Sequence, residues 1–213
     1  MADAEPQGDQ ALAPRGQPRQ RRAIERRRAI LDAALALLEE HSLDSLTTSL
    51  IATRAGVPVA SVYAYFPNKM AVVAELAREA MAEVDARLTA MLPATFDAAG
   101  LDLAVDRAIE TVLAGYRALP ARQRLFSSIR GNAVLMPVLR ESDDRMMDVV
   151  ARSIEAARPD LPCVRARAIA QTTVATFTAM QDYALPCEDP EYFAALVEEW
   201  RRIVKLYLAS LAQ

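Results

Sequence analysis

The stretch TTSLIATRAGVPVASVYAYFPNK, residues 47–69, constrains the fold of this chain more than any other segment. Thr47 suits the N-cap of a short helix, and Gly56 suits its C-terminal end because glycine adopts positive φ without a steric penalty. Pro58 suits the first position of a second helix. Two short helices that meet through a glycine-containing turn predict a helix-turn-helix.

The second helix of this pair has an outer face that suits contact better than solvation. Val62 and Phe66 lie one turn apart and are expected to face inward. The side chains left on or beside the outer face are small, aromatic or hydroxylic, and none is charged: Val59, Ser61, Tyr63, Ala64 and Tyr65. In a helix-turn-helix the second helix enters the major groove, so this face is predicted to meet DNA.

Two kinds of DNA contact are predicted. Val59, Ala60 and Ala64 are expected to make apolar contacts with bases, and Ser49 and Ser61 to hydrogen-bond to base edges or phosphates. The residues expected to hold phosphates and to brace the reading helix are Thr47, Thr48, Tyr63, Tyr65 and Lys69.

The longer segment TTSLIATRAGVPVASVYAYFPNKMAVV resembles the DNA-binding domain of the TetR family of bacterial transcriptional regulators, within a match from about Ile24 to Leu76. The residues at the family's spacing are Thr47, Ile51, Ala52, Ala55, Gly56, Val57, Tyr63, Tyr65, Phe66 and Lys69. The resemblance implies that the first three helices bind operator DNA and that the fourth leads to a ligand-binding domain. It also implies that the last two helices pair two protomers. Pro58, Ala60 and Ala64 depart from residues common in the family, so the base preference does not follow from the resemblance.

The N-terminal part of the chain is basic. Residues 10–70 hold nine Lys and Arg against five Asp and Glu, whereas residues 71–213 hold 16 against 20. This asymmetry indicates that one end of the chain meets a polyanion.

Residues 1–20 lack periodicity and are predicted to be a disordered tail. Arg21 and Arg22 follow it at the start of the first helix, where the helix dipole disfavours cations unless an anion is nearby. This arm either folds into an adjacent minor groove or is a solvated run of charge, and the sequence favours neither alternative.

The rest of the chain is predicted to be helical, which makes the protein all-α. Strand alternation is absent, and apolar residues recur at helical spacing. The expected helices after a long one that ends near Leu92 are 101–118, 121–130, 138–157, 163–185 and 190–212. Together with this pattern, the resemblance implies two domains, a DNA-binding domain over residues 21–69 and an effector-binding and dimerisation domain over residues 70–213.

A cavity for an effector is implied by the resemblance, and the sequence supplies side chains that suit one. The candidate lining residues are Tyr116, Phe126, Met136, Met146, Met147, Phe177, Met180 and Gln181. Aromatic and methionine side chains at these positions are also what an ordinary core needs. If a cavity exists, the apolar character of this set favours an apolar or aromatic effector.

Other chemistry finds little support in the sequence. Cys163 and Cys187 flank one expected helix, whose ends lie about 36 Å apart, so they are not expected to form a disulfide within the chain. His41 is the only histidine, and no metal, cofactor or enzymatic activity is expected. No apolar run is long enough for a membrane span, and no secretory leader opens the sequence, so a cytoplasmic protein is expected.

The sequence therefore predicts a homodimeric regulator that binds palindromic operator DNA. The last helix carries an apolar stripe too wide for one neighbour, which favours pairing through the last two helices. Repression relieved by a small molecule is the expected mode of action. A regulator with a filled core and no effector, or a transcriptional activator, remains an alternative.

Overall fold

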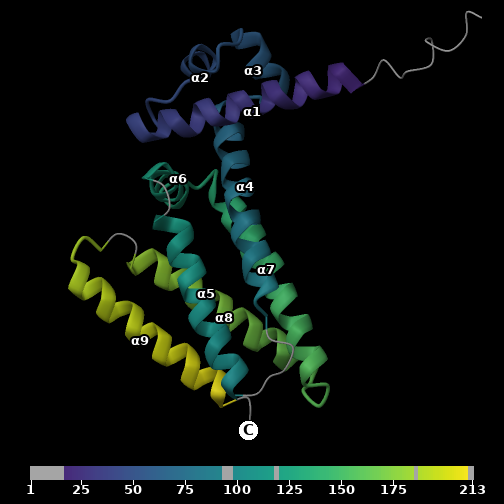
Figure 1. The fold of residues 1–213 in the computed structure, drawn as a ribbon, viewed down its shortest axis with the longest axis vertical. Coiled ribbons are helices and arrows are strands. Elements are labelled where there is room, and N and C mark those ends of the chain that lie inside the picture. Colours follow the sequence, from purple (N-terminus) through teal and green to yellow (C-terminus); the bar gives the residue numbers. More distant parts are fainter. Residues whose placement is uncertain (1–16, 93–97, 118–119, 185–186, 211–213) are drawn as a thin grey trace, which may run out of the picture.

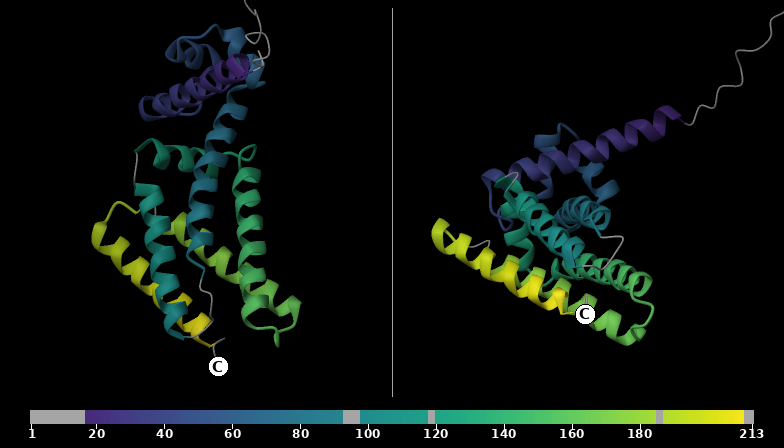
Figure 2. Two further views of the ribbon diagram at one scale, coloured as in Figure 1. Left: turned by 45° about the vertical axis from the view of Figure 1, so that its right-hand side comes forward. Right: turned by 60° about the horizontal axis from the view of Figure 1, so that its bottom comes forward.

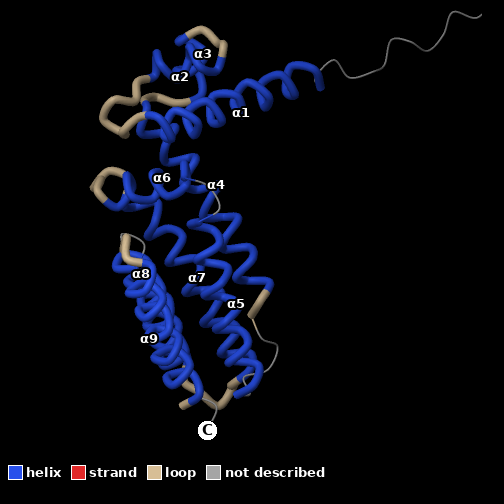
Figure 3. Tube along the Cα trace, turned by 60° about the vertical axis from the view of Figure 1, so that its left-hand side comes forward, coloured by secondary structure: helices blue, strands red, loops and turns tan. Residues whose placement is uncertain are grey.

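The computed structural model describes residues 17–92, 98–117, 120–184 and 187–210, and every regular element within these ranges is an α-helix. The first helices of the chain form a head, a long helix runs away from it, and the remaining helices form a larger body below (Figure 1). The tube in Figure 3 contains helices and loops throughout the part of the chain that is described. The all-α prediction is confirmed.

The head consists of α1 (Gln17–Glu40), α2 (Thr48–Ala55) and α3 (Val59–Tyr65). Its core closes around side chains with no exposed surface: Ile30, Leu31, Leu37, Leu46, Ile51 and Val62. Helix α1 begins at Gln17, so the last four residues of the predicted tail belong to a helix. Residues 1–16 lie outside the described residues.

The ends of the short helices follow from local signals in the sequence. The Thr47 side chain accepts a hydrogen bond from Leu50 N at 3.1 Å, as an N-cap should. Gly56 ends α2 with a φ of 66°, in the left-handed region that favours glycine. Pro58 is the N-cap of α3 and not its first helical residue, which corrects the prediction by one position. Its ψ of 143° is extended, so the helix starts at Val59.

Helix α4 (Lys69–Ala90) joins the head to the body. Asn68 caps it by accepting a hydrogen bond from Ala71 N at 3.0 Å. Its first half packs on α1, and its second half packs on α5 and α7 (Figures 1 and 2). One helix therefore belongs to both parts of the molecule.

The body contains α5 (Ala98–Arg117), α6 (Pro120–Arg130), α7 (Met136–Ala157), α8 (Cys163–Ala184) and α9 (Pro190–Ala209). These helices start and end within about three residues of the expected positions. Helices α7 and α8 pack together, α8 contacts α9, and α9 also packs on α5 (Figures 2 and 3). Their shared core includes Ile109, Ala166 and Trp200. Among the described residues, no helix is both long and apolar enough to cross a membrane.

Candidate nucleic-acid interface and internal cavity

The outer face of α3 is open to solvent. Ala60, Tyr63 and Ala64 are exposed, whereas Val59, Ser61 and Tyr65 are half-buried at its sides. Val62 is fully buried beneath them, and Phe66, the residue that ends the helix, is buried as well. The inward and outward sides of this helix are therefore those that its sequence predicts.

Hydroxyl groups join α2 to α3 on this open side. Thr48 Oγ1 and the Tyr63 hydroxyl lie 3.0 Å apart, and either oxygen can be the donor. Ser49 is exposed beside them, and Thr47 is exposed at the N-cap of α2. The contact between Thr48 and Tyr63 thus joins the start of α2 to the outer face of α3.

Lys69, at the start of α4, is held by the head itself. Its Nζ donates to the backbone carbonyl oxygens of Leu43 and Asp44, each at 2.9 Å. An ammonium group has three hydrogens, so two are used within the protein and one is left for another acceptor. The first role of Lys69 in the folded chain is to tie α4 to the loop after α1.

Arg21 and Arg22 lie on the first turns of α1 and are exposed. Arg21 Nε pairs with Glu25 at 2.8 Å, one turn further along the same helix. The two arginines therefore project from a helix, which limits any disordered arm to residues that precede Gln17. Exposed pairs of this kind contribute little to stability, so the Arg21 guanidinium is readily available to a stronger anion.

A cavity of about 170 Å³ lies in the body, between α4, α5, α7 and α8. It is far larger than the roughly 10–15 Å³ that a single water molecule needs on the same measure. Its wall is mostly apolar, with Met81, Val84, Leu88, Met91, Val105, Ala108, Val112, Leu139, Val150 and Ile154 among the lining residues.

Half of the candidate lining residues lie where the sequence predicts. Phe126, Met146, Phe177 and Gln181 line the cavity. Met136 and Met180 do not line it, and each packs against one of the two hydrophobic cores of the molecule. Met147 follows Met146 on α7, and the turn of the helix directs it away from the cavity wall. The Tyr116 side chain lies outside the described residues.

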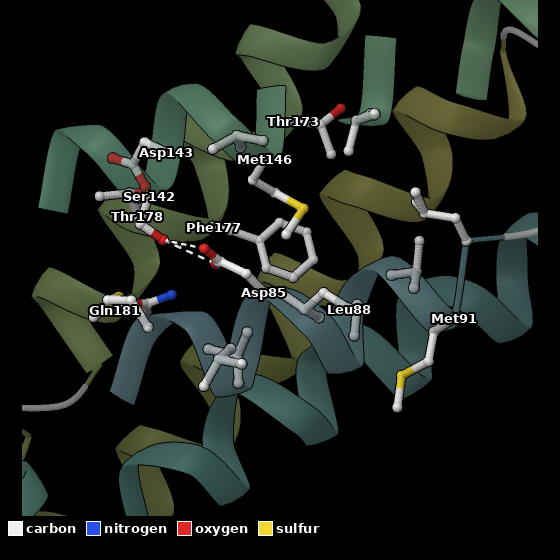
Figure 4. Close-up of a pocket in the computed structure, with 18 of the residues that line it drawn as sticks. Asp85, Leu88, Met91, Ser142, Asp143, Met146, Thr173, Phe177, Thr178 and Gln181 are labelled. Carbon is white, nitrogen blue, oxygen red and sulfur yellow. Dashed lines mark hydrogen bonds between the residues drawn. The ribbon is translucent and has the colours of Figure 1, made fainter. Parts of the chain in front are cut away.

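One end of the cavity is polar, which the sequence does not predict. Ser142 Oγ lies 2.8 and 2.9 Å from the two carboxylate oxygens of Asp85, and Thr178 Oγ1 donates to Asp143 Oδ1 at 3.1 Å. Figure 4 shows these four side chains and Gln181 together on one side, with Leu88 and Met91 on the other. Within the run ESDD at 141–144, Ser142 is buried and Asp143 faces the cavity.

The Asp143 carboxyl titrates abnormally because of its surroundings. Burial raises its pKa above the ordinary value, and the nearby carboxylates of Asp85 and Asp144 raise it further. The hydrogen bond from Thr178 and the charge of Arg130 act in the opposite direction without cancelling these effects. An ionised Asp143 is therefore costly in the empty cavity.

Within the described residues, no group of three or more His, Cys, Asp and Glu side chains could hold a metal ion. His41 follows the end of α1, and its imidazole lies 3.9 Å from the Glu40 carboxylate, far from the cavity. Cys163 is exposed at the start of α8. The residues that line the cavity include neither histidine nor cysteine.

The outer face of α8 and α9 exposes large apolar side chains. Val164 is 77% exposed, Ile203 61% and Leu206 73%. Tyr183 and Tyr192 are exposed on the same two helices. The opposite side of α9 is buried through Val197, Trp200 and Val204, so this helix has one covered and one open apolar face.

A helix-turn-helix head on an all-helical body defines the class of DNA-binding transcriptional regulators. Comparison with known families identifies which one. The chain matches "Bacterial regulatory proteins, tetR family" over residues 30–76 and "Tetracyclin repressor-like, C-terminal domain" over residues 100–208. The protein therefore belongs to the TetR family of transcriptional regulators. Its fold and family are those of DNA-binding regulators and not of enzymes.

Known proteins agree with this assignment. A segment of 56 residues is 45% identical to the HTH-type transcriptional repressor KstR of Rhodococcus jostii (strain RHA1). It covers 26% of each protein, so the chain aligns with about a quarter of that repressor. A TetR-family regulator of Streptomyces coelicolor is 26% identical, with a TM-score of 0.63 over 87% of this chain and 98% of the other.

The fatty acid degradation regulator FadR of Bacillus halodurans shares the fold as well. It is 20% identical, with a TM-score of 0.61 over 83% of this chain and 96% of the other. At this identity the likeness concerns the architecture alone.

Proposed function

We propose that the protein is a homodimeric repressor that binds a palindromic operator and leaves it when a small molecule enters the cavity. The observation that carries this proposal is the course of α4. This helix begins at Lys69 beside α3, and its second half lines the cavity through Asp85 and Leu88. A ligand that shifts α4 therefore also shifts the head.

Ion pairs support such coupling because they fix the head to α4. Arg27 pairs with Glu75 and with Glu79, and Arg28 pairs with Glu79 at 2.6 Å. The Arg27 guanidinium also lies 5.8 Å from the centre of the Phe66 ring, directly after α3. These links favour movement of the head and the first half of α4 as one body.

A second contact, besides α4, connects the head to a helix that lines the cavity. Arg124 of α6 donates to the backbone carbonyl of Glu39 near the end of α1. Phe126 and Arg130 of the same helix line the cavity. The head thus meets cavity-lining helices at two places, and a ligand that changes the spacing of α4 and α6 would reorient it.

Operator recognition is assigned to the face described above. Val59, Ala60 and Ala64 contact base edges in the major groove, and Ser49 and Ser61 hydrogen-bond to bases or phosphates. Thr47, Thr48, Tyr63, Tyr65 and Lys69 fix the backbone of the duplex. Because the protein acts on chromosomal DNA, its place of action is the cytoplasm.

Dimerisation is assigned to the exposed apolar face of α8 and α9. A twofold pair of these helices would cover Ile203 and Leu206 and would present two α3 helices to one side of a duplex. Half-sites about 34 Å apart, one turn of DNA, are then expected, which makes the operator a palindrome.

Two alternatives to this proposal are a regulator without an effector and a transcriptional activator. A regulator without an effector needs a filled core, and the cavity of about 170 Å³ argues against that alternative. An activator would contact DNA in the same way. Repression is favoured because the similar protein KstR is a transcriptional repressor. A transcription assay with purified polymerase and the selected operator separates the two outcomes.

Selection of random duplex DNA by the purified protein, at about 150 mM salt to suppress non-specific binding, tests the proposal. Enrichment of a palindrome, bound by two protomers in analytical ultracentrifugation, is the expected result. A folded dimer that enriches no sequence, or a single protomer bound to an asymmetric site, would contradict it.

A further inference from the structure

The cavity has two chemically different ends. We define the acidic end by Asp85, Ser142, Asp143 and Thr178, which lie together in Figure 4. Along α7 the lining then continues through Met146 and Val150 to Ile154. At about 1.5 Å per residue, Asp143 and Ile154 are about 16 Å apart along the helix axis. The cavity therefore suits an elongated molecule with one polar end.

The charges around the acidic end do not balance. Arg145 Nη2 lies 3.3 Å from Asp85 Oδ2 and compensates that carboxylate. Arg130 also lines the cavity, but its guanidinium pairs with Asp182 and donates to Gln181 Oε1 at 3.0 Å. The Asp143 carboxylate has only the Thr178 hydroxyl as a hydrogen-bond donor among the described residues. Arg130 acts on Asp143 only as a nearby charge, so this carboxylate forms no ion pair among the described residues.

An unpaired carboxylate in an apolar cavity selects what can bind beside it. A ligand that fills the cavity removes the water around Asp143, and this desolvation is costly unless the ligand supplies a donor or a positive charge. A neutral apolar ligand supplies neither. An anionic ligand would be repelled by the Asp143 carboxylate, and the Arg130 guanidinium already pairs with Asp182 and donates to Gln181.

We infer that the effector is an amphiphilic cation, with an ammonium-type head at Asp143 and an apolar body that extends toward Ile154. This inference rests on the proposed function, because it names the chemical class of the effector that the cavity would take. It narrows the apolar or aromatic effector expected from the sequence by adding a positively charged end.

The only tryptophan provides a measurement of cavity occupancy. The Trp200 ring packs edge-on against Phe177, with ring centres 4.6 Å apart, and Phe177 lines the cavity. The test titrates the full-length protein with decylamine, decanol and decanoate, which share an apolar chain and differ in the head group. Tryptophan emission follows binding, and isothermal titration calorimetry measures the same constants independently.

The expected result is that decylamine binds at least about tenfold more tightly than decanol, in keeping with a hydrogen bond to a charged group. Decanoate is expected to bind more weakly than decanol. Equal binding of decylamine and decanol, tighter binding of decanoate, or no binding of decylamine would overturn the inference.

A matched pair of variants tests whether the ammonium group of decylamine binds at Asp143. Asp143→Asn removes the charge in the cavity and keeps the shape, whereas Asp144→Asn removes a charge from the exposed side of the same helix. Decylamine affinity should fall about tenfold or more in Asp143→Asn and much less in Asp144→Asn, with decanol binding unchanged in both. Equal losses in the two variants would show that overall charge, and not Asp143, attracts the amine.

Operator binding in the presence of each probe separates this inference from the proposed function. If all three probes bind equally and each releases DNA, the effector-controlled regulator stands and the cationic effector is wrong. If decylamine binds selectively through Asp143 but operator DNA remains bound, the cavity does recognise a cation. The proposal that such a ligand releases the protein from DNA is then wrong.

Discussion

Thr48 Oγ1 lies 3.0 Å from the hydroxyl of Tyr63, which joins the first turn of α2 to the outer face of α3. Both groups lie on the open side of the helix-turn-helix, and Tyr63 is 54% exposed. The pair orients the tyrosine hydroxyl without burying it. It therefore remains able to donate to a phosphate oxygen of bound DNA.

Tyr63→Phe tests this role because it removes one oxygen and keeps the ring. Operator affinity should fall about tenfold, since a hydrogen bond to a charged phosphate is lost. The free energy of unfolding should change by less than about 0.5 kcal/mol, because the site is on the surface. Fluorescence anisotropy with labelled operator measures the affinity. Tyr192→Phe, at an exposed tyrosine of α9 outside the head, is the matched control and should bind DNA as the unaltered protein does.

Lys69→Met should destabilise the head. The substitution removes two hydrogen bonds from an ammonium group to the carbonyl oxygens of Leu43 and Asp44. Chemical denaturation should show a loss of about 1–3 kcal/mol. If the third hydrogen of the ammonium also holds a phosphate, the slope of log affinity against log salt should decrease by about one. A variant of unchanged stability would show that these two hydrogen bonds contribute nothing.

Gly56→Ala isolates the cost of backbone conformation. An added Cβ would meet no atom within 4 Å, so steric contact plays no part, but the φ of 66° is unfavourable for alanine. The free energy of unfolding should decrease by about 1–2 kcal/mol. Gly56→Asn should lose less than alanine does, because asparagine tolerates this conformation. Equal losses for the two variants would point to a cause other than φ.

The shifted pKa of Asp143 predicts a stability that depends on pH. Since the pKa is raised in the folded state, the destabilisation by ionised Asp143 begins above the ordinary pKa of an aspartate and is complete above the raised pKa. Below the ordinary pKa of an aspartate, both states are protonated and this penalty disappears. Asp143→Asn should therefore raise the melting temperature at neutral pH by at most a few degrees, because solvent still screens part of the carboxylate. The gain should vanish as the pH falls through the carboxylate range. Asp144→Asn should gain less, and a larger gain for that exposed control would contradict the assignment.

Leu206→Glu should weaken the dimer. Leu206 is 73% exposed on the open face of α9, where twofold pairing would place it in an apolar contact. The dissociation constant of the dimer should rise about 100-fold or more if this residue is central to the interface. Sedimentation equilibrium measures the change. Val134→Glu, at a residue 70% exposed in the turn between α6 and α7, should leave the dimer intact.

The sequence predicts the head well because its signals are local. The cap formed by Thr47 and the turn at Gly56 depend on residues within a few positions of each other, and the spacing of Val62 and Phe66 determines which face is buried. The same rules place the body helices to within about three residues. Pro58 differs by one position because proline is compatible with both the N-cap and the first turn.

The cavity depends on how distant helices pack, so only part of it could be predicted. Asp85 of α4 meets Ser142 of α7, and Asp143 of α7 meets Thr178 of α8. No local pattern brings these residues together. Residue type indicated Met146 and Phe177 as candidates. Met147 is a methionine on the same helix as Met146, but it does not line the cavity. One feature of the sequence could have indicated the polar end of the cavity. Ser142 and Asp143 lie four and three residues before Met146, and therefore on the same side of α7.

Parallel selection of random duplexes by the unaltered protein and by Ala64→Gln tests the reading role of α3 most directly. Ala64 is exposed on that helix, and glutamine can form two hydrogen bonds with adenine in the major groove. The account predicts that both proteins enrich palindromes that differ at one symmetric position in each half-site. The same palindrome from both proteins would show that Ala64 does not face the bases, and no palindrome from the unaltered protein would contradict the account of a dimeric operator-binding regulator.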